Sequence, residues 1–494
     1  MKVRSLEELE DRVLALYEST IEECYAGPRN EDKESWEEIE GRIRGVVRAI
    51  VGSRHIEQKG KLGPNDLVFE TDLHGDLVAF LNTVLSTGLV KFNEDNPLGI
   101  VFYDPLTDQE YDLHTFEKHV ASLGRDRSIE LMRRIQLLPD VAPTEDFGKY
   151  INCGDILDRG QQSEQLLYLI RRLCGGYSKK YPENSAPTII IGNHEGLLII
   201  PDYDNSLTVA LISAGGKNGA NHIFSSIKYI YGYCCDSDIK KQNCALKFRD
   251  MGMAVRTAID SGEFTLAHRV GKTIFTHAVI TVGMIENLSK RFNTLAEALE
   301  NASGWDSRGD QTLKKEIQVL AKNLDLLAKR VSYPRDLSES EIDNLVDTLN
   351  KFNVARAKLI ERRGRIAGVE EETNPLLPGE YGIVKIMNQG IDDDITWLRK
   401  RFTSNSTKLP PGVKFVLGHD PDPEEHRKWN PGMISYIDSY VSSGYNEGTT
   451  RANYFVADRS IFDSEGPFSE KRAPHIVSED ITPAMLEERA RATV

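Results

Sequence analysis

The sequence predicts an α/β protein into which a helical hairpin is inserted. Three features support this prediction. Short apolar runs and amphipathic helical patterns succeed one another between residues 67 and 276. A heptad pattern replaces them over about 287–369, and an α/β pattern resumes from Gly382. The chain has 494 residues, which suffices for one large domain with insertions or for two or three domains.

Composition and charge narrow the class of protein. The chain is 40% hydrophobic and 28% charged, and it has no apolar run long enough to cross a membrane. Its net charge of −15 argues against a nucleic-acid partner, which requires a basic footprint. The first residues lack the apolar segment of a Sec signal peptide. The six cysteines show no CxxC spacing, so we expect reduced thiols and a cytoplasmic-type soluble protein.

Two amphipathic helices are expected first, over 5–25 and about 31–52. Ser5 and Glu8 form a capping box at the start of the first helix, and Gly27-Pro28 ends it. We expect this region, residues 1–55, to pack on the main domain.

The first strand is expected over 67–71, and it runs into Asp72-Leu73-His74-Gly75-Asp76. Residues 91–150 carry no obvious chemistry and are interpreted as an insertion. Within it, 104–108 has the composition of a hairpin turn, and a helix is expected over about 115–137.

Polar residues follow each of the later strands. A short apolar run, Tyr150-Ile151, precedes a loop with two acids, an arginine and two glycines. Further strands are expected over 188–191, 273–276 and 413–417. The segments that follow these four runs are Gly154-Asp155-Ile156-Leu157-Asp158-Arg159-Gly160, Gly192-Asn193-His194-Glu195, His277 and Gly418-His419-Asp420.

Between the last two strands, the apolar residues alternate spacings of four and three. They are Leu313, Ile317, Leu320, Leu324 and Leu327, then Ile342, Leu345, Leu349 and Phe352. With Tyr333-Pro334 between them, they predict two long helices in an antiparallel, coiled-coil-like hairpin over 287–369. Its charged outer positions favour a hairpin that protrudes and is available to a protein partner, over helices packed flat on the core. The tail from Ser460 is charged and expected to be loosely held.

Six side chains at these strand ends form a set of metal donors. Three are oxygen donors, three are imidazoles, and none is a cysteine. This combination suits a pair of divalent ions such as Mn²⁺, Fe²⁺ or Zn²⁺ better than a structural zinc. The candidate metal ligands are Asp72, His74, Asp155, Asn193, His277 and His419.

These motifs resemble the signature of the calcineurin-like metallophosphoesterases, and specifically of the phosphoprotein phosphatase family. The resemblance rests on Asp72-x-His74-Gly75, Gly154-Asp155-x-x-Asp158-Arg159-Gly160 and Gly192-Asn193-His194-Glu195. It covers about 65–300 and 380–460. It implies a layered fold with a central β-sandwich flanked by helices.

Three later segments extend the resemblance. Thr276-His277 and Leu417-Gly418-His419 resemble the two later metal-histidine motifs, and Trp397-Leu398-Arg399 resembles a phosphate-binding arginine segment. The metallophosphatase domain would then comprise 56–286 and 375–494.

The resemblance implies a role for each matched residue. Asp72 and His74 would hold one metal, Asp155 would bridge both, and Asn193, His277 and His419 would hold the second. His194 would be the general acid and Asp158 would orient it, while Arg159 and Arg399 would clamp the phosphoryl oxygens. A metal-bridging hydroxide would attack a phosphomonoester directly, with manganese the first choice and iron or zinc the alternatives. The implied substrate is a protein phosphorylated on tyrosine, serine or threonine.

The chain also departs from the family pattern. Thr71 precedes Asp72 where a glycine is usual, Asp76 stands where Gln or Asn is common, and Ala278-Val279 follows His277. The insertions and the hairpin resemble those of the Wip-type effector phosphatases that Legionella secretes, which would imply secretion into a host cell.

Three alternatives remain open at this point. Cys153-x5-Arg159 matches the signature of cysteine phosphatases, in which a thiolate attacks phosphate. The metal site could instead serve a diadenosine polyphosphate or another nucleotide. Finally, the chain could be a scaffold that acts through its hairpin.

Overall fold

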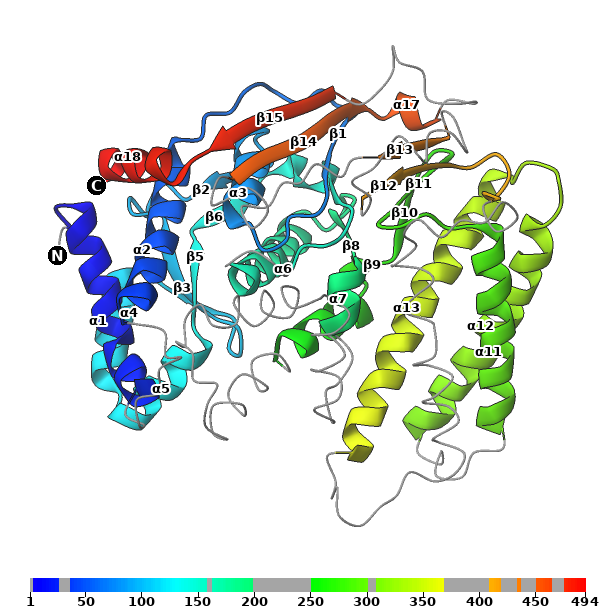
Figure 1. Ribbon diagram of the computed structural model, residues 1–494, viewed down its shortest axis with the longest axis horizontal. Coiled ribbons are helices and arrows are strands. Elements are labelled where there is room, and N and C mark those ends of the chain that lie inside the picture. Colours follow the sequence, from blue (N-terminus) through cyan, green and yellow to red (C-terminus); the bar gives the residue numbers. More distant parts are fainter. Residues whose placement is uncertain are drawn as a thin grey trace.

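The computed structural model confirms the α/β class. Two main sheets lie in the upper middle of the view in Figure 1, with helices to their left, below them and to their right. No helix in the part of the chain that the structure describes is long and apolar enough to cross a membrane. The described residues are 3–25, 36–157, 162–198, 250–300, 308–367, 408–418, 433–436, 450–463 and 475–494.

The first sheet has the strand order β15-β14-β1-β7-β8-β9. From β1 to β9 the strands are parallel, whereas β14 and β15 are antiparallel to their neighbours. Parallel strands end at the same edge of a sheet, so β1, β7 and β8 deliver their following loops to one place. The bounds are β1 (Asp66–Glu70), β7 (Tyr150–Asn152), β8 (Thr188–Ile190), β9 (Phe264–Thr265), β14 (Thr450–Asp458) and β15 (His475–Ile481).

The second sheet has the order β10-β11-β12-β13, and its last three strands are parallel. Only Leu266 separates β9 from β10, so the chain passes directly from one sheet to the other. The bounds are β10 (Ala267–Val270), β11 (Thr273–Thr276), β12 (Lys414–Leu417) and β13 (Ile434–Tyr436).

A small apolar core lies between the two sheets. Phe69 of β1 meets Phe275 of β11 edge to face, with ring centroids 5.5 Å apart. Strand side chains alternate between faces, so the neighbouring Val68 belongs to the larger core beneath the helices. The buried members of the core between the sheets are Leu67, Phe69, Ile151, Cys153, Ile190, Val270, Phe275, Val416, Ala457 and Phe462.

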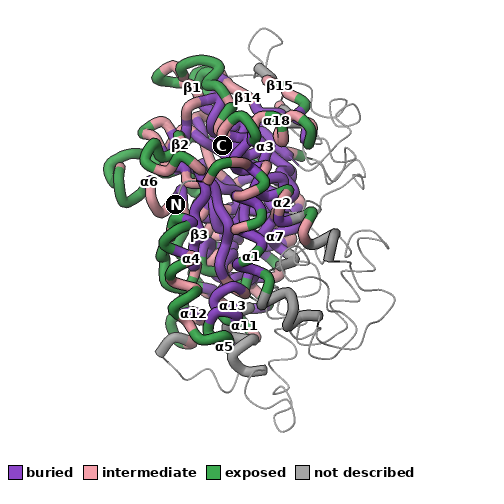
Figure 2. The backbone as a smooth tube through the Cα atoms, turned by 90° about the vertical axis from the view of Figure 1, so that its left-hand side faces the viewer, coloured by how far each residue is buried: buried purple, intermediate pink, exposed green. Residues whose placement is uncertain are grey.

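The larger core joins the first sheet to the N-terminal helices and to α3 and α6. Figure 2 shows this core as buried tube with exposed segments outside it. The predicted N-cap is confirmed, because Ser5 Oγ accepts a hydrogen bond from the Glu8 amide at 3.2 Å. The helices are α1 (Leu6–Tyr25), α2 (Trp36–Gly52), η1 (Ser53–His55), α3 (Leu77–Ser86), α6 (Ser163–Lys180) and α7 (Asn193–Leu198).

Residues 91–150 form two small sheets and two helices. The hairpin turn at 104–108 is confirmed, since β3 and β4 pair on either side of it. The single helix expected over 115–137 is wrong. Leu123 and Gly124 adopt extended backbone angles, which end α4 and start α5. The bounds are β2 (Val90–Phe92), β3 (Ile100–Asp104), β4 (Gln109–Tyr111), α4 (Leu113–Ser122), α5 (Arg125–Arg134), β5 (Gln136–Pro139), β6 (Val141–Pro143) and η2 (Glu145–Lys149).

The range of the expected hairpin contains three helices among the described residues, at the right of Figure 1. They are α11 (Val282–Glu300), α12 (Arg308–Val331) and α13 (Glu339–Ala367), and we call them the three-helix unit. The turn at Tyr333-Pro334 lies between α12 and α13 as predicted. The prediction of a two-helix coiled coil nevertheless describes only part of this unit, because α11 packs along α12 as well. The seam from Leu313 to Phe352 is buried inside this unit.

The expectation of a protruding hairpin is wrong, because α13 packs against β10 of the second sheet. The side chain of Asn350 on α13 accepts hydrogen bonds from the amides of Leu266 and Ala267, at 2.9 and 3.0 Å, and donates one to the Ala267 carbonyl at 3.0 Å. The polar outer surface that suggested protrusion is the solvent face of helices that lie on the core.

The expectation of a loosely held tail is also wrong. After α17 (Ser460–Asp463), β15 pairs with β14 from the Val456–His475 pair to the Thr450–Ile481 pair, and α18 (Pro483–Thr493) packs on α2. Thr482 caps α18, with Pro483 in the first turn.

Candidate metal centre

The loops that carry the predicted ligands have unusual backbone angles. Asp72, His74 and Asp155 adopt left-handed conformations with φ of 53°, 45° and 52°. Among the described residues, one other non-glycine residue, Asp108, has a positive φ. A left-handed residue with a side chain costs roughly 1–2 kcal/mol, so these conformations need support from the surrounding structure.

Backbone hydrogen bonds between two loops provide part of that support. The amides of Asp72, His74 and Gly75 donate to the carbonyls of Gly154, Asp155 and Ile156, at 2.9, 2.8 and 2.6 Å respectively. The loop after β1 is therefore held in register with the loop after β7, and their polar side chains face the same space.

Glu195 supplies a second support, which sequence reasoning did not identify although it belongs to a recognised motif. Its buried carboxylate accepts hydrogen bonds from the amides of Gly192, Leu157 and Asp155, at 2.7, 2.9 and 3.1 Å. Burial raises the pKa of Glu195, and the charge of Asp155 raises it further. One side chain thus ties the loop after β7 to the loop after β8.

Three glycines allow the strand ends to approach one another. A Cβ at Gly192 would lie 2.1 Å from Asp155 Oδ1, and one at Gly154 would lie 2.7 Å from His277 Nδ1. A Cβ at Gly418, which follows β12, would lie 2.8 Å from Asp72 Oδ2. A side chain at any of these three positions would clash with a candidate ligand, so glycine allows the strand ends of the two sheets to approach one another closely.

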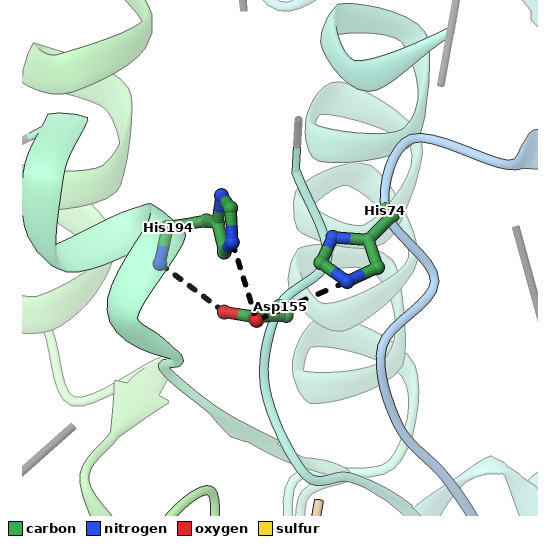
Figure 3. Close-up of side chains that lie close together, drawn as sticks. All are labelled: His74, Asp155 and His194. Atoms are coloured by element: carbon green, nitrogen blue, oxygen red, sulfur yellow. Dashed lines mark hydrogen bonds and ion pairs between the residues drawn. The ribbon is translucent and has the colours of Figure 1, made fainter. Parts of the chain in front are cut away.

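Asp155 lies at the centre of this convergence, as Figure 3 shows for two of its neighbours. Its Oδ2 is 3.3 Å from Nε2 of His277, 3.6 Å from Nε2 of His194 and 4.0 Å from Nε2 of His74. Its Oδ1 accepts a hydrogen bond from the His194 amide at 3.1 Å. One carboxylate is shared by three imidazoles from three strand ends.

Two sets of side chains around Asp155 could each hold a metal ion. One is His74, Asp155 and His194, and the other is Asp72, Asp155 and His277. The donor atoms in each set lie within 4.8 Å of one another, and all five side chains are buried. The sets have one member in common, Asp155, so two ions bound here would share its carboxylate.

The electrostatics of the site favour a cation. Burial lowers the pKa of His277, but the Asp155 carboxylate outweighs that effect and the pKa is raised to about 9. The ring therefore carries a proton at neutral pH, with Nδ1 2.9 Å from the Cys153 carbonyl and Nε2 facing Asp155. Metal binding releases such protons, so a divalent ion bound to this ring would take the place of its proton. The donor set fits the predicted metals.

Asn193 adds a buried amide that could donate further hydrogen bonds. Its Oδ1 lies 3.0 Å from His277 Nε2, whereas its buried Nδ2 has no hydrogen-bond partner among the described residues. Buried amide donors are nearly always satisfied in native proteins. A site that receives an anionic group, such as phosphate, would satisfy this one.

The structure thus brings together six of the ten residues that the sequence singled out. These are Asp72, His74, Asp155, Asn193, His194 and His277. The other four, Asp158, Arg159, Arg399 and His419, lie outside the described residues.

The position of Cys153 disfavours the cysteine-phosphatase alternative. The side chain is fully buried in the core between the two sheets. Burial raises the pKa of the Cys153 thiol well above its ordinary value, and the charges of Asp72 and Glu70 raise it further. A nucleophilic cysteine needs a lowered pKa and access to substrate, and Cys153 has neither.

A second buried acid, Glu70, is not among the candidate residues predicted from the sequence. The hydroxyls of Tyr150 and Thr83 both donate to its carboxylate, and burial raises its pKa to about 8. The signal in the sequence was a charged residue within an otherwise apolar strand, 67–71.

Comparison with known proteins adds little to this geometry. No family model matches the chain, and no curated protein sequence matches it. Among solved structures, the chain is similar to a cold-active protein-tyrosine phosphatase from a psychrophilic Shewanella species. The TM-score is 0.29 and the identity 11%, over 84% of each chain, which is too low to support an argument about fold or function.

Proposed function

We propose that this protein is a metal-dependent phosphoprotein phosphatase that hydrolyses phosphomonoesters at a two-metal site centred on Asp155. The observation that supports it is the sharing of one buried carboxylate by two potential metal sites. A bridging carboxylate on a rigid strand end is what two adjacent cations require. The motifs around it resemble those of the calcineurin-like metallophosphoesterases in residue type and in order.

The layering expected of that family is part of the proposal. Two sheets share a core, helices lie on the outer face of the first sheet, and the candidate ligands follow the carboxyl ends of strands in both sheets. This arrangement supports a β-sandwich flanked by helices.

Following the motif resemblance, we assign Asp72 and His74 to one metal, Asp155 to both, and Asn193, His277 and His419 to the other. The donor sets around Asp155 divide the side chains differently, with Asp72 beside His277 and His74 beside His194. Bound Mn²⁺, Fe²⁺ or Zn²⁺ would supply a more acidic water and would neutralise charge on the phosphoryl group. Arg159 and Arg399 would bind the phosphoryl oxygens, which a planar guanidinium matches with two parallel hydrogen bonds.

His194 is assigned as the general acid that protonates the leaving oxygen, oriented by Asp158. It stands near the start of α7 and is anchored by its amide, which donates to Asp155 Oδ1. Its Nε2 lies 3.6 Å from Asp155 Oδ2, so the ring could alternatively contribute to metal binding. The experiments must separate these two roles.

Substituting Asp155→Asn tests the proposal as a whole. Asparagine tolerates the left-handed backbone, so the change removes charge and leaves the conformation accessible. We expect loss of Mn²⁺ binding in calorimetry and loss of nearly all hydrolysis of an aryl phosphate. Asp108→Asn is a matched control, because Asp108 is also left-handed but lies on a surface turn. Activity that survives both EDTA and Asp155→Asn would contradict the metal mechanism.

Substituting His194→Ala tests whether His194 acts as the general acid or as a metal ligand. Loss of a general acid lowers kcat on the order of 10²–10⁴-fold while both metals stay bound. If the metal content of the purified variant fell, His194 would be a ligand instead. His114→Ala, at an exposed position on α4, controls for nonspecific effects.

Assays with a panel of phosphorylated compounds would identify the substrate class. Phosphotyrosine, phosphoserine and phosphothreonine peptides are compared with diadenosine tetraphosphate, each with Mn²⁺ and with EDTA. Release of phosphate from the peptides and not from the nucleotide is the expected result. Preference for the nucleotide would retain the metal site and overturn the protein substrate.

We also propose that the three-helix unit binds the protein substrate through the outer face of α12. Val319 and Leu326 on α12 are spaced by seven residues and are 57% and 64% exposed, and Tyr333, in the turn after α12, is 65% exposed. Lys315 and Lys322 lie on the same exposed face. An apolar row with positive charges beside it is complementary to a phosphorylated, acidic protein segment.

The double variant Leu326→Ser/Lys322→Glu tests this surface. We expect kcat/KM to fall for a phosphoprotein and to stay unchanged for a small aryl phosphate. Leu106→Ser is the matched control, since Leu106 is 76% exposed on the β3–β4 turn. Equal effects on both substrates would show that the α12 face is structural.

A further inference from the structure

We propose that Thr71 is a positioning residue that fixes which oxygen of Asp72 faces the metal site. The inference rests on the proposed function, because Asp72 is taken as a metal ligand. Thr71 and Asp72 are adjacent in sequence, and both are buried.

The hydroxyl of Thr71 has one proton and two acceptors within reach. It forms a short hydrogen bond with Oδ2 of Asp72, and it lies 3.3 Å from the Cys153 carbonyl. That carbonyl is also 2.9 Å from His277 Nδ1. The proton of Thr71 therefore goes to Asp72, and His277 serves the carbonyl.

With Oδ2 held in this way, the other oxygen of Asp72 faces the site. Oδ1 lies 3.7 Å from Nε2 of His74, the residue paired with Asp72 in the proposed site. A carboxylate that turned freely about its last bond could offer either oxygen or both. Thr71 selects one oxygen and leaves it directed toward His74.

The second sheet closes over this hydroxyl. A Cβ at Gly418 would lie 2.1 Å from Thr71 Oγ1, so the backbone of Gly418 is packed directly against it. The hydroxyl is thus enclosed by the ends of β1, β7 and β12, which contribute Thr71, Cys153 and Gly418. This packing restricts the Thr71 side chain and keeps water from competing for Asp72.

The expected size of the effect follows from comparable sites. Hydrogen bonds to a charged acceptor are about twice as strong as those between neutral groups. Groups that hydrogen-bond to a metal ligand typically change metal affinity by about 10–100-fold when they are removed. Thr71 meets both conditions, so its contribution should be measurable by direct metal titration.

The test compares Thr71→Val with Thr71→Ser in the full-length chain. Valine keeps the shape and removes the donor, and serine keeps the donor. We expect Thr71→Val to bind Mn²⁺ about 10–100-fold more weakly in calorimetry and to alter the electron paramagnetic resonance spectrum of bound Mn²⁺. Thr71→Ser should restore both properties. Thermal unfolding of the metal-free variants shows whether each one folds.

The outcomes separate this inference from the proposed function. Wild-type Mn²⁺ affinity in Thr71→Val, or equal losses in the valine and serine variants, would overturn the positioning role. Should Thr71→Val fail to fold, Thr71→Ala takes its place, because it removes the same donor without adding bulk beside Asp72 and should weaken Mn²⁺ binding similarly. If Asp155→Asn retained Mn²⁺ as well, the metal site itself would be rejected.

Discussion

The strand-end loops of the candidate metal centre and the helices of the three-helix unit place different requirements on the sequence. In the loops, each residue is required by a particular contact. Glu195 accepts hydrogen bonds from three backbone amides, and Gly192 leaves room for the carboxylate of Asp155. In the three-helix unit, positions such as Leu320 and Leu324 need only be apolar and correctly spaced. The loops depend on residue identity, and the helices depend on pattern.

The two regions also differ in what they do to stability. Left-handed Asp72, His74 and Asp155 are buried and carry charge or polarity, and each feature opposes folding. The seam of the three-helix unit buries apolar side chains in regular helices, which favours folding. A region that opposes folding persists when the rest of the molecule stabilises it, and such regions are where binding and catalysis are found.

Substituting Gly192→Ala should give the largest effect, because it tests the loops where the fit is tightest. The new Cβ would lie 2.1 Å from Asp155 Oδ1 and 2.4 Å from its amide nitrogen. Either Asp155 moves or the loop after β8 shifts, at a cost of roughly 1–3 kcal/mol for overpacking. We expect loss of Mn²⁺ binding in calorimetry together with a lowered free energy of unfolding.

Gly175→Ala is the matched control for that experiment. Gly175 lies on α6 with no atom within 4 Å of the added Cβ. Alanine favours helix over glycine by roughly 1 kcal/mol, so this variant should be as stable as the wild type or more so. Similar behaviour of the two variants would erase the distinction between loops and helices.

The same distinction explains what the sequence could predict. The candidate residues Asp72, Asp155 and His194 could be named from the sequence because each closely follows a short apolar run, and the strands before them end close to where they were expected. Glu195 was not assigned a role, because the Asp155 and Leu157 amides that it binds follow another strand. Thr71 was noted only as a departure from the family pattern, because the enclosure of its hydroxyl by Cys153 and Gly418 depends on two other strands. Glu70 could have been noticed as a charge in an apolar strand.

Pattern alone predicted the helices less well. The heptad spacing of α12 and α13 identified a seam, but the same spacing serves a two-helix hairpin and a three-helix unit equally, and α11 was missed. Protrusion was inferred from charged outer positions, which any surface helix has. The prediction of a loosely held tail was wrong because a local signal was overlooked and a long-range pairing could not be seen. Thr482 and Pro483 are a helix-start signal, while the pairing of β15 with β14 depends on a distant strand.

Substituting Asn350→Ala should give an intermediate effect, at the junction between the two kinds of region. Its side chain satisfies the amides of Leu266 and Ala267, where the chain crosses between the sheets. Leaving partly buried donors unpaired costs roughly 1–3 kcal/mol. We expect a lower free energy of unfolding in urea, with Mn²⁺ affinity unchanged. Asn344→Ala, at an exposed position on α13, should have little effect. A loss of Mn²⁺ affinity in Asn350→Ala would show that the unit and the metal centre are coupled.

The smallest effect is expected from Glu341, which joins α12 to α13 at the surface. Hydrogen bonds from Arg330 and from the Ser338 amide lower the pKa of Glu341 to about 2. A carboxyl whose pKa is lowered on folding stabilises the folded state above its unfolded pKa, near 4.5, and that contribution is lost as the pH falls toward 2. Glu341→Gln should therefore be slightly less stable than the wild type at pH 7, and the difference should shrink as the pH falls from 4.5 toward 2 in urea unfolding of the metal-free proteins. A constant gap at every pH would mean that shape, and not charge, closes this turn. Mn²⁺ affinity at neutral pH should be the same in both proteins, since this contact lies in the three-helix unit and not in the strand-end loops.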